Sequence, residues 1–216
     1  MELFIIFDLD GTLVDSEMLC NQAFKDLIPE IKDSINLLTK MYKGKKLSEI
    51  MNDIELRHHI KLYNGFENIY RKHVSDLFTK NLQPTSGTIK MLENIGNKYC
   101  LASSGPIEKI QHSLRISGLE KYFESNIFSS YEVNSWKPDP GLFLFAAHSM
   151  NITPEKCIII DDSDVGIIAA KEAKMKYLKY CPELKIRYLE EQKEFRSMND
   201  LIDILGNIET ENGINI

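Results

Sequence analysis

Two carboxylates, one residue apart, follow the first apolar run of the chain. Residues 3–7 are apolar and rich in β-branched and aromatic side chains, a pattern that predicts a buried strand. Asp8 and Asp10 come directly after it, and Gly11 lets the backbone turn beside them. Because open α/β sheets bind ligands at the carboxyl ends of their strands, we expect both acids to lie in a crevice.

The spacing of Asp8 and Asp10 favours a metal site. Carboxylates this close repel each other in a partly desolvated site, so a proton or a cation must lie between them. Oxygen ligands without nearby His or Cys favour Mg²⁺ over zinc or copper. Asp-Gly is also a common turn dipeptide, so the two acids could merely close a turn. The short motif alone leaves both interpretations open.

A second apolar run, residues 157–160, also ends in acids. Asp161 and Asp162 follow it directly, and Asp164 comes two residues later. One of these acids could cap the helix that follows, because carboxylates stabilise helix amino termini. Three acids within four residues exceed what a cap needs. The second run therefore repeats the pattern of the first, with paired acids at a strand end.

Two other stretches carry groups suited to an anion. Ser103 and Ser104 end the expected strand 99–103, and Pro106 opens the next helix, so a hydroxyl lies beside a helix amino terminus. Lys137 stands between a tryptophan and a two-proline turn, which would hold its charge in place. A simple turn and an exposed loop lysine remain the alternatives at these two places.

The elements between the motifs alternate from residue 87 onward. Helical patterns cover 87–97, 107–117, 141–150, 165–174 and 200–205, and strand patterns cover 99–103, 127–129, 157–160 and 177–180. Such alternation predicts an α/β, Rossmann-like parallel sheet flanked by helices.

Residues 16–82 show helical spacing alone, without a strand pattern. A proline-containing turn at 83–87 closes this stretch. We therefore expect two domains: a core of residues 1–15 and 83–216, and a small helical cap of residues 16–82 inserted after the first strand.

The composition limits the partners of the protein. The chain has 216 residues, of which 43% are hydrophobic and 27% charged, and its net charge is −6. The negative charge argues against a nucleic-acid surface, and no apolar run is long enough to span a bilayer. The chain starts in the first strand without a basic and apolar leader. We expect a cytoplasmic protein, a monomer or a weak homodimer.

These motifs resemble those of the haloacid dehalogenase-like hydrolases. The first, Asp-x-Asp-Gly-Thr, continues into Leu-Val-Asp-Ser-Glu. Ser103 matches the second motif, Lys137 in Lys-Pro-x-Pro the third, and Asp161-Asp162-Ser followed by Gly-Ile-x-Ala-Ala the fourth. The four motifs occur in the family's order over nearly the whole chain, each at a strand end or in an adjoining loop.

The resemblance implies a phosphatase that works through a covalent intermediate. Asp8 would be the nucleophile that becomes an aspartyl-phosphate, and Asp10 the general acid and base. Lys137 would bind the transferring phosphoryl group and steady the nucleophile. Ser103 and the backbone N–H groups near Ser104 would hold the phosphoryl oxygens.

The resemblance also implies the ligands of a Mg²⁺ ion. Asp8 and the backbone carbonyl of Asp10 would bind it from the first motif. Asp162, with Asp161 beside it, would complete the set. The expected reaction is the Mg²⁺-dependent hydrolysis of a small phosphomonoester.

Other activities occur within the same family. A dehalogenase has a single leading Asp and no metal, so Asp10 argues against one. A phosphonatase needs a cap lysine, and three lysines at residues 43–46 leave this weakly open. A β-phosphoglucomutase-like enzyme carries a histidine where this chain has Cys20. A non-catalytic member would need a damaged motif, and none is visible.

The expected substrate is a phosphorylated metabolite. Lys45 and Lys46 flank the junction of two cap helices, where related proteins have a specificity loop, and they would suit a second negative group. Ordinary solvated lysines are the alternative. The stretches 104–113 and 136–140 resemble bacterial sugar-phosphate phosphatases that act on 6-phosphogluconate.

Overall fold

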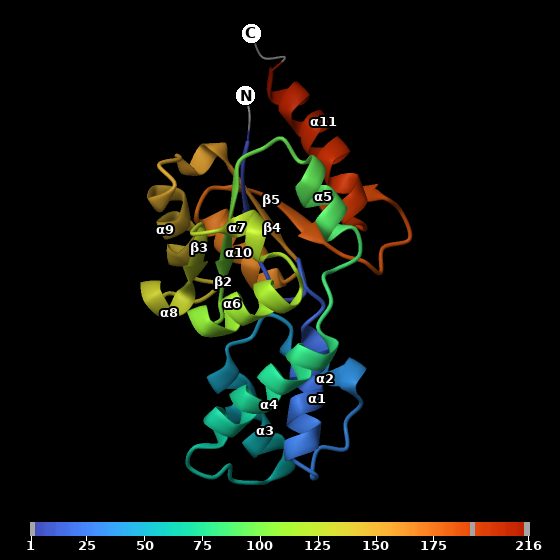
Figure 1. Cartoon of the computed structure of the whole chain (residues 1–216), viewed down its shortest axis with the longest axis vertical. Helices are drawn as coiled ribbons and strands as arrows, with labels where there is room; N and C mark the ends of the chain where they lie inside the picture. Colours follow the sequence, from blue (N-terminus) through green and yellow to red (C-terminus); the bar gives the residue numbers. More distant parts are fainter. Residues whose placement is uncertain (1–2, 191–192, 214–216) are drawn as a thin grey trace.

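The computed structural model describes residues 3–190 and 193–213. Within these residues, seven strands form one sheet in the order β3-β2-β1-β4-β5-β7-β6 (Figure 1). Five parallel strands are β1 (Phe4–Phe7), β2 (Tyr99–Ser103), β3 (Ile127–Ser129), β4 (Cys157–Asp161) and β5 (Lys176–Tyr180), and β7 (Glu194–Phe195) also runs parallel to β5. The expected α/β parallel core is confirmed.

The position of β1 explains why its sequence is apolar throughout. It pairs with β2 on one side and β4 on the other, so that Ile6 lies opposite both Cys100 and Ile159. Side chains of a strand alternate between the two faces of a sheet. Both faces of β1 are covered by helices, and all four of its residues are buried.

Helices pack on both faces of the sheet. The face that carries Ile6 is covered by α9 (Gly141–Ser149) and α10 (Asp164–Glu172). The face that carries Ile5 is covered by α5 (Thr88–Asn94), α6 (Ile107–Ile116), α7 (Glu120–Phe123) and α11 (Leu201–Gly213). Short helices lie at α8 (Ser130–Val133), η1 (Pro154–Lys156) and η2 (Met198–Asp200).

The segment after β1 is helical, as its spacing predicts. It contains α1 (Glu17–Leu27), α2 (Ile35–Tyr42), α3 (Leu47–His58) and α4 (Phe66–Asn81). These helices lie together at one end of the molecule, below the sheet in Figure 1. Phe24 of α1 stacks on Tyr70 of α4, with ring centroids 4.2 Å apart. The division into a helical cap (residues 16–82) and a core remains our proposal.

The chain leaves the sheet for the helical cap and returns at neighbouring places. The N–H of Asp15 donates to the carbonyl of Gln83 (3.1 Å), and the N–H of Thr85 donates to that of Leu13 (2.9 Å). Val14 and Pro84 also form an isolated β-bridge. The two connections therefore lie side by side.

The structure extends the sequence prediction at the carboxyl-terminal end. The helix expected at 200–205 continues as α11 to Gly213. A hairpin that the sequence pattern did not predict, β6 (Tyr188–Leu189) and β7 (Glu194–Phe195), adds to β5. None of the described helices has the length and apolar character needed to cross a bilayer.

Candidate active site

Three buried carboxylates meet at the carboxyl ends of β1 and β4. Asp8 follows β1, Asp161 ends β4, and Asp162 comes next. Their side-chain oxygens lie within 4.8 Å of one another, although the residues come from distant parts of the chain. All three side chains are buried. Adjacent parallel strands thus bring the two acidic motifs together, as expected from strand-end placement.

Lys137 links two of these carboxylates. Its Nζ lies 2.5 Å from Asp8 Oδ1 and 2.6 Å from Asp161 Oδ2, and only 4% of its side chain is exposed. Burial alone would lower the pKa of this lysine, but attraction to the two carboxylates raises it above its ordinary value. Lys137 is therefore a fixed positive charge beside Asp8.

The carboxylate cluster carries more negative charge than Lys137 neutralises. Burial raises the pKa of Asp8 well above its usual range; Lys137 opposes this, and the neighbouring acids add to it. Burial also raises the pKa of Asp162 to about 6. An all-oxygen set of three buried acids, two of them with raised pKa values (Asp8 and Asp162), fits a hard divalent cation, which would offset their repulsion.

The residues after β1 are shaped to accept Asp162. Gly11 has φ +79°, a conformation that favours glycine. A Cβ at this position would overlap the carboxylate of Asp162. The buried hydroxyl of Thr12 donates a hydrogen bond to Asp162 Oδ1 over 3.0 Å. Glycine and threonine of the first motif therefore position a carboxylate of the fourth.

Asp161 is held by the first turn of α10. Its Oδ1 accepts hydrogen bonds from the N–H (2.8 Å) and the hydroxyl (2.7 Å) of Ser163. Ser163 is also the N-cap of α10, because its hydroxyl accepts from the N–H of Gly166. A Cβ at Gly166 would collide with the Asp161 carboxylate, so glycine permits the close approach of the helix.

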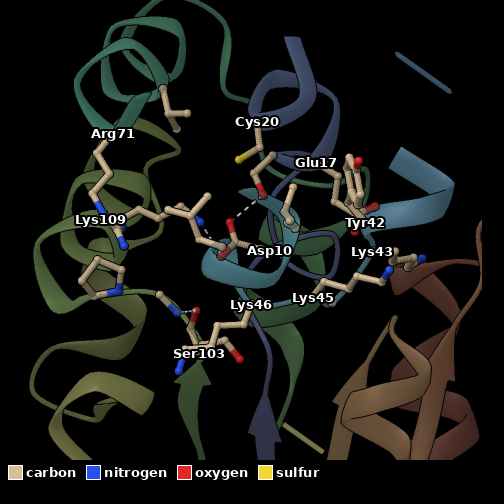
Figure 2. A pocket seen from close by; sticks show the side chains of 18 of the residues that line it. Asp10, Glu17, Cys20, Tyr42, Lys43, Lys45, Lys46, Arg71, Ser103 and Lys109 are labelled. Carbon is tan, nitrogen blue, oxygen red and sulfur yellow. Dashed lines mark hydrogen bonds and ion pairs between the residues drawn. The ribbon is translucent and has the colours of Figure 1, made fainter. Parts of the chain in front are cut away.

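The Asp10 side chain has different partners. Its carboxylate accepts hydrogen bonds from the Ser16 hydroxyl and from Lys109 Nζ, each over 2.6 Å, as the dashed lines in Figure 2 indicate. Burial would raise the pKa of Asp10, but Lys109 and Ser16 outweigh burial and lower it. The Asp10 carboxylate lies outside the three-acid cluster. The expected metal contact through its backbone carbonyl stays a prediction.

Ser103 and Ser104 lie where β2 ends. Ser103 is buried, and its hydroxyl accepts a hydrogen bond from the N–H of Gly105 over 3.2 Å. Both serines line the same cavity as Asp8 and Lys137. The expected nucleophile and the two stretches expected to bind phosphate therefore open onto one space, while their individual roles stay predictions.

This cavity has a volume of about 400 Å³ and lies between the strand ends and the helical cap. That volume is within the range of small-molecule sites. The turn between α2 and α3, residues 43–46, lines it and is named here the cap loop. Figure 2 shows Lys43 and Lys45 on one side of the cavity and Arg71 and Lys109 on the other.

Several residues of this cavity were not predicted as site residues from the sequence. Lys43 Nζ lies 2.8 Å from Asp162 Oδ2, a contact that depends on how the helical cap docks. Lys109 reaches Asp10 from α6, six residues after Ser103. Ser16, which also lines the cavity, and Thr12, which contacts Asp162 without lining it, belong to the extended first motif, which was the available signal for them.

Comparison with known proteins identifies the family to which this chain belongs. The sequence matches the haloacid dehalogenase-like hydrolase family over residues 5–179. The chain belongs to this family. The 6-phosphogluconate phosphatase of Escherichia coli strain K12 is 36% identical over 182 residues, covering 83% of this chain and 82% of that protein. The expected membership of a hydrolase family is confirmed.

Two further relatives extend the comparison. The phosphorylated carbohydrates phosphatase of Thermotoga maritima is 29% identical over 177 residues, covering 78% of this chain and 80% of that protein. The crystal structure of a putative β-phosphoglucomutase from Thermotoga maritima has a TM-score of 0.75 and 26% identity. The structural match covers 96% of this chain and 100% of the Thermotoga maritima chain. Similar chains thus include proteins named as phosphatases and one named as a mutase.

Proposed function

We propose that this protein is a Mg²⁺-dependent phosphatase that hydrolyses a small phosphomonoester through an aspartyl-phosphate. One observation carries the proposal. Asp8, Lys137, Asp161 and Asp162 lie in one cluster, and all of them except the buried Asp161 line a cavity that Asp10 and Ser103 also line. A nucleophile, a fixed countercharge and a cation site are what phosphoryl transfer needs.

In the proposed reaction, a carboxylate oxygen of Asp8 attacks phosphorus and the bond to the leaving alcohol breaks. Asp10 gives its proton to that alcohol. A water molecule then attacks the phosphorus of the aspartyl-phosphate and gives a proton to Asp10, which releases phosphate and restores Asp8. Because Lys109 and Ser16 favour ionised Asp10, this residue must take up a proton before the first step.

The chain's own groups would neutralise the phosphoryl oxygens. Lys137 already lies against Asp8 and would contact an oxygen of the group attached there. Ser103 and backbone N–H groups near Ser104 would hold the other oxygens. Asp8, Asp161, Asp162 and the Asp10 carbonyl would hold Mg²⁺, which would supply charge neutralisation when bound.

We propose a sugar phosphate as the substrate. The curated relative with 36% identity is named for 6-phosphogluconate, and another is named for phosphorylated carbohydrates. Lys45 and Lys46 on the cap loop line the cavity, where they would contact the sugar part. We further propose that the protein works in the cytoplasm as a monomer or a weak homodimer.

A phosphosugar mutase is the second candidate, because one similar structure carries that name. The expected histidine is replaced by Cys20, which lines the cavity. Burial raises the pKa of the Cys20 thiol to about 11, so it stays protonated near neutral pH. A neutral thiol is a poor substitute for the proton transfer of histidine, which favours hydrolysis over mutase activity.

Phosphate release from a panel of sugar phosphates, with Mg²⁺ and after chelation, tests the proposal. We expect release that depends on Mg²⁺ and falls by about a thousandfold or more in Asp8→Asn, because the nucleophile is lost. Asp15→Asn is the matched control, since Asp15 belongs to the same motif but is exposed. Circular dichroism checks that the fold is retained. Near-normal turnover by Asp8→Asn would refute the assignment.

A further inference from the structure

The cavity contains an acid, Glu17, that the proposed reaction does not use. Glu17 is the first residue of α1, is half-buried and lines the cavity. Its carboxyl group has no hydrogen-bond or ion-pair partner among residues 3–190 and 193–213. Burial raises the pKa of Glu17 to about 8; nearby acids add to this increase and Lys43 opposes it. Withdrawing a carboxyl group from water without a partner is costly, and a cation that reached Glu17 would remove that cost.

Lys43 is a cation that both Glu17 and Asp162 attract. Its Nζ lies 2.8 Å from Asp162 Oδ2. Burial would lower the pKa of Lys43, but Asp162 and, to a smaller extent, Glu17 raise it. Figure 2 shows Glu17 and Lys43 on the side of the cavity that lies opposite Arg71 and Lys109. The ammonium of Lys43 therefore has one carboxylate in contact and a second carboxyl group within electrostatic reach.

The contact of Lys43 with Asp162 conflicts with the proposed metal site. Asp162 Oδ1 accepts a hydrogen bond from Thr12, and Oδ2 lies against Lys43, so both oxygens already have a neighbour. A divalent cation held by Asp8, Asp161 and Asp162 would lie close to the ammonium of Lys43. Repulsion between two cations at short range is strong in a buried site. We therefore expect Lys43 to leave Asp162 when such a cation binds.

The side chain of Lys43 can change its partner while the backbone of the cap loop stays in place. The next residue, Gly44, packs so closely on the start of α10 that a Cβ there would lie 2.8 Å from Ser163 Cβ. The lysine stem is flexible, so the ammonium can move without the backbone. Glu17 belongs to the helical cap, as Lys43 does, whereas Asp162 follows β4 of the core. The move would replace an ion pair between cap and core with one inside the cap.

We propose that Lys43 moves from Asp162 to Glu17 when Mg²⁺ binds, and that Glu17 thereby strengthens Mg²⁺ binding although it is not a metal ligand. This inference rests on the proposed metal site and assigns a role to two residues that take no part in bond breaking. The arriving ammonium favours the ionised form of Glu17, whose proton passes to solvent. Lys43 stays paired in the metal-loaded cavity, and one contact that holds the helical cap to the core is lost.

Titration calorimetry with Mg²⁺, in the absence of substrate, tests this exchange in four proteins: the wild type, Glu17→Gln, Lys43→Met and the double variant. Glutamine keeps the size of the glutamate side chain and cannot ionise. We expect Glu17→Gln to bind Mg²⁺ about fivefold more weakly than the wild type, because the displaced ammonium then has no second carboxylate. In the Lys43→Met background the same substitution should change the affinity by less than about twofold. The difference between these two effects measures the coupling of Glu17 to Lys43.

Glu108→Gln is the matched control for the loss of a negative charge. Glu108 also lines the cavity but is an exposed residue of α6, so its replacement should have the same small effect with and without Lys43. Equal weakening by Glu17→Gln in both backgrounds would identify a metal ligand or a general charge effect and overturn the inference, as would an unchanged affinity in both. Absence of Mg²⁺ binding by all four proteins would overturn the proposed metal site as well. Circular dichroism checks that each variant is folded.

Discussion

The contact between Lys43 and Asp162 brings a cation of the helical cap onto a proposed metal ligand. The two groups are 2.8 Å apart, and the Asp162 side chain is only 2% exposed. Burial would lower the pKa of Lys43, but attraction to Asp162 raises it above its ordinary value, so the lysine stays charged. A divalent cation at the same carboxylate would meet this charge at close range.

Lys43→Met should therefore bind Mg²⁺ severalfold more tightly than the wild-type protein, in the absence of substrate. Removing the ammonium abolishes a competitor for Asp162 and leaves the three carboxylates in place. Titration calorimetry measures the affinity directly. Lys45→Met is the comparison, because Lys45 has no acidic partner among the described residues and should leave the affinity unchanged. Weaker binding by Lys43→Met would contradict this view.

The contact between Lys109 and Asp10 predicts a change in pH dependence. Lys109→Met removes the cation that lowers the pKa of Asp10, so this pKa should rise. The proton on Asp10 would then persist to higher pH, and the limbs of the pH–rate profile that report Asp10 should move to higher pH. Profiles of kcat/KM measure the shift. Lys109→Arg keeps the charge and should keep the wild-type profile; identical profiles in all three proteins would exclude this role.

Among the structural elements, the cap loop packs closely against the core at Gly44. Gly44 has φ +71°. A Cβ there would lie 2.7 Å from Val165 Cγ2 and 2.8 Å from Ser163 Cβ, both at the start of α10. These separations are too short for ordinary contact. The residue that places Lys43 and Lys46 over the cavity must therefore be small.

Gly44→Ala should lower kcat/KM, whereas Gly65→Ala should not. Gly65 also has a positive φ, +89°, but a Cβ there would meet nothing within 4 Å. Both substitutions should lower the free energy of unfolding by about 1 kcal/mol because of the backbone conformation. Only the first also displaces the cap loop. Urea unfolding and steady-state kinetics measure the two effects, and equal activities would show that the close packing is unimportant.

Sequence patterns predicted the elements that have strong local signals. The expected strands 99–103 and 127–129 coincide with β2 and β3, because apolar runs bounded by turns are distinctive. β6 and β7 have only two residues each, too few for a periodic pattern, and their place depends on pairing at the edge of β5. The capping box of Ser129 and Glu132 was a readable signal for α8.

The candidate site also contains some residues that the sequence predicts and others that it does not. Acids at strand ends are readable because adjacent parallel strands must bring them together, and Asp8 and Asp161 do meet. The contacts of Lys43 and Lys109 depend on the packing of helices across the cavity. Lysine is common on exposed surfaces, so nothing in the local sequence distinguishes these two.

At the scale of the whole molecule, the acidic cluster connects two parts of the chain that are distant in sequence. Asp8 lies at the beginning of the chain, whereas Asp161 and Asp162 lie about 150 residues later, on β4 and after it. A bound cation would join them. It would also offset the burial and the mutual repulsion that raise the pKa values of Asp8 and Asp162 in the protein without metal.

Mg²⁺ should therefore raise the melting temperature of the protein. A ligand that binds only the folded state contributes about 2.7 kcal/mol at a hundred times its Kd. Asp162→Asn should lose most of this gain, whereas Asp164→Asn, in which an exposed acid is replaced, should keep it. Thermal unfolding with Mg²⁺ and with chelator measures the difference. An equal response of the two variants would place the ion elsewhere.

The paired connections between the sheet and the helical cap have a consequence for how the protein can diverge. Because Asp15 lies against Gln83 and Leu13 against Thr85, the inserted segment begins and ends at one seam. Its helices could be exchanged for others, or grafted onto a related core, without redirecting the strands. If the helical cap contacts the substrate as we propose, selectivity can change in a lineage while the acids at the strand ends stay in place.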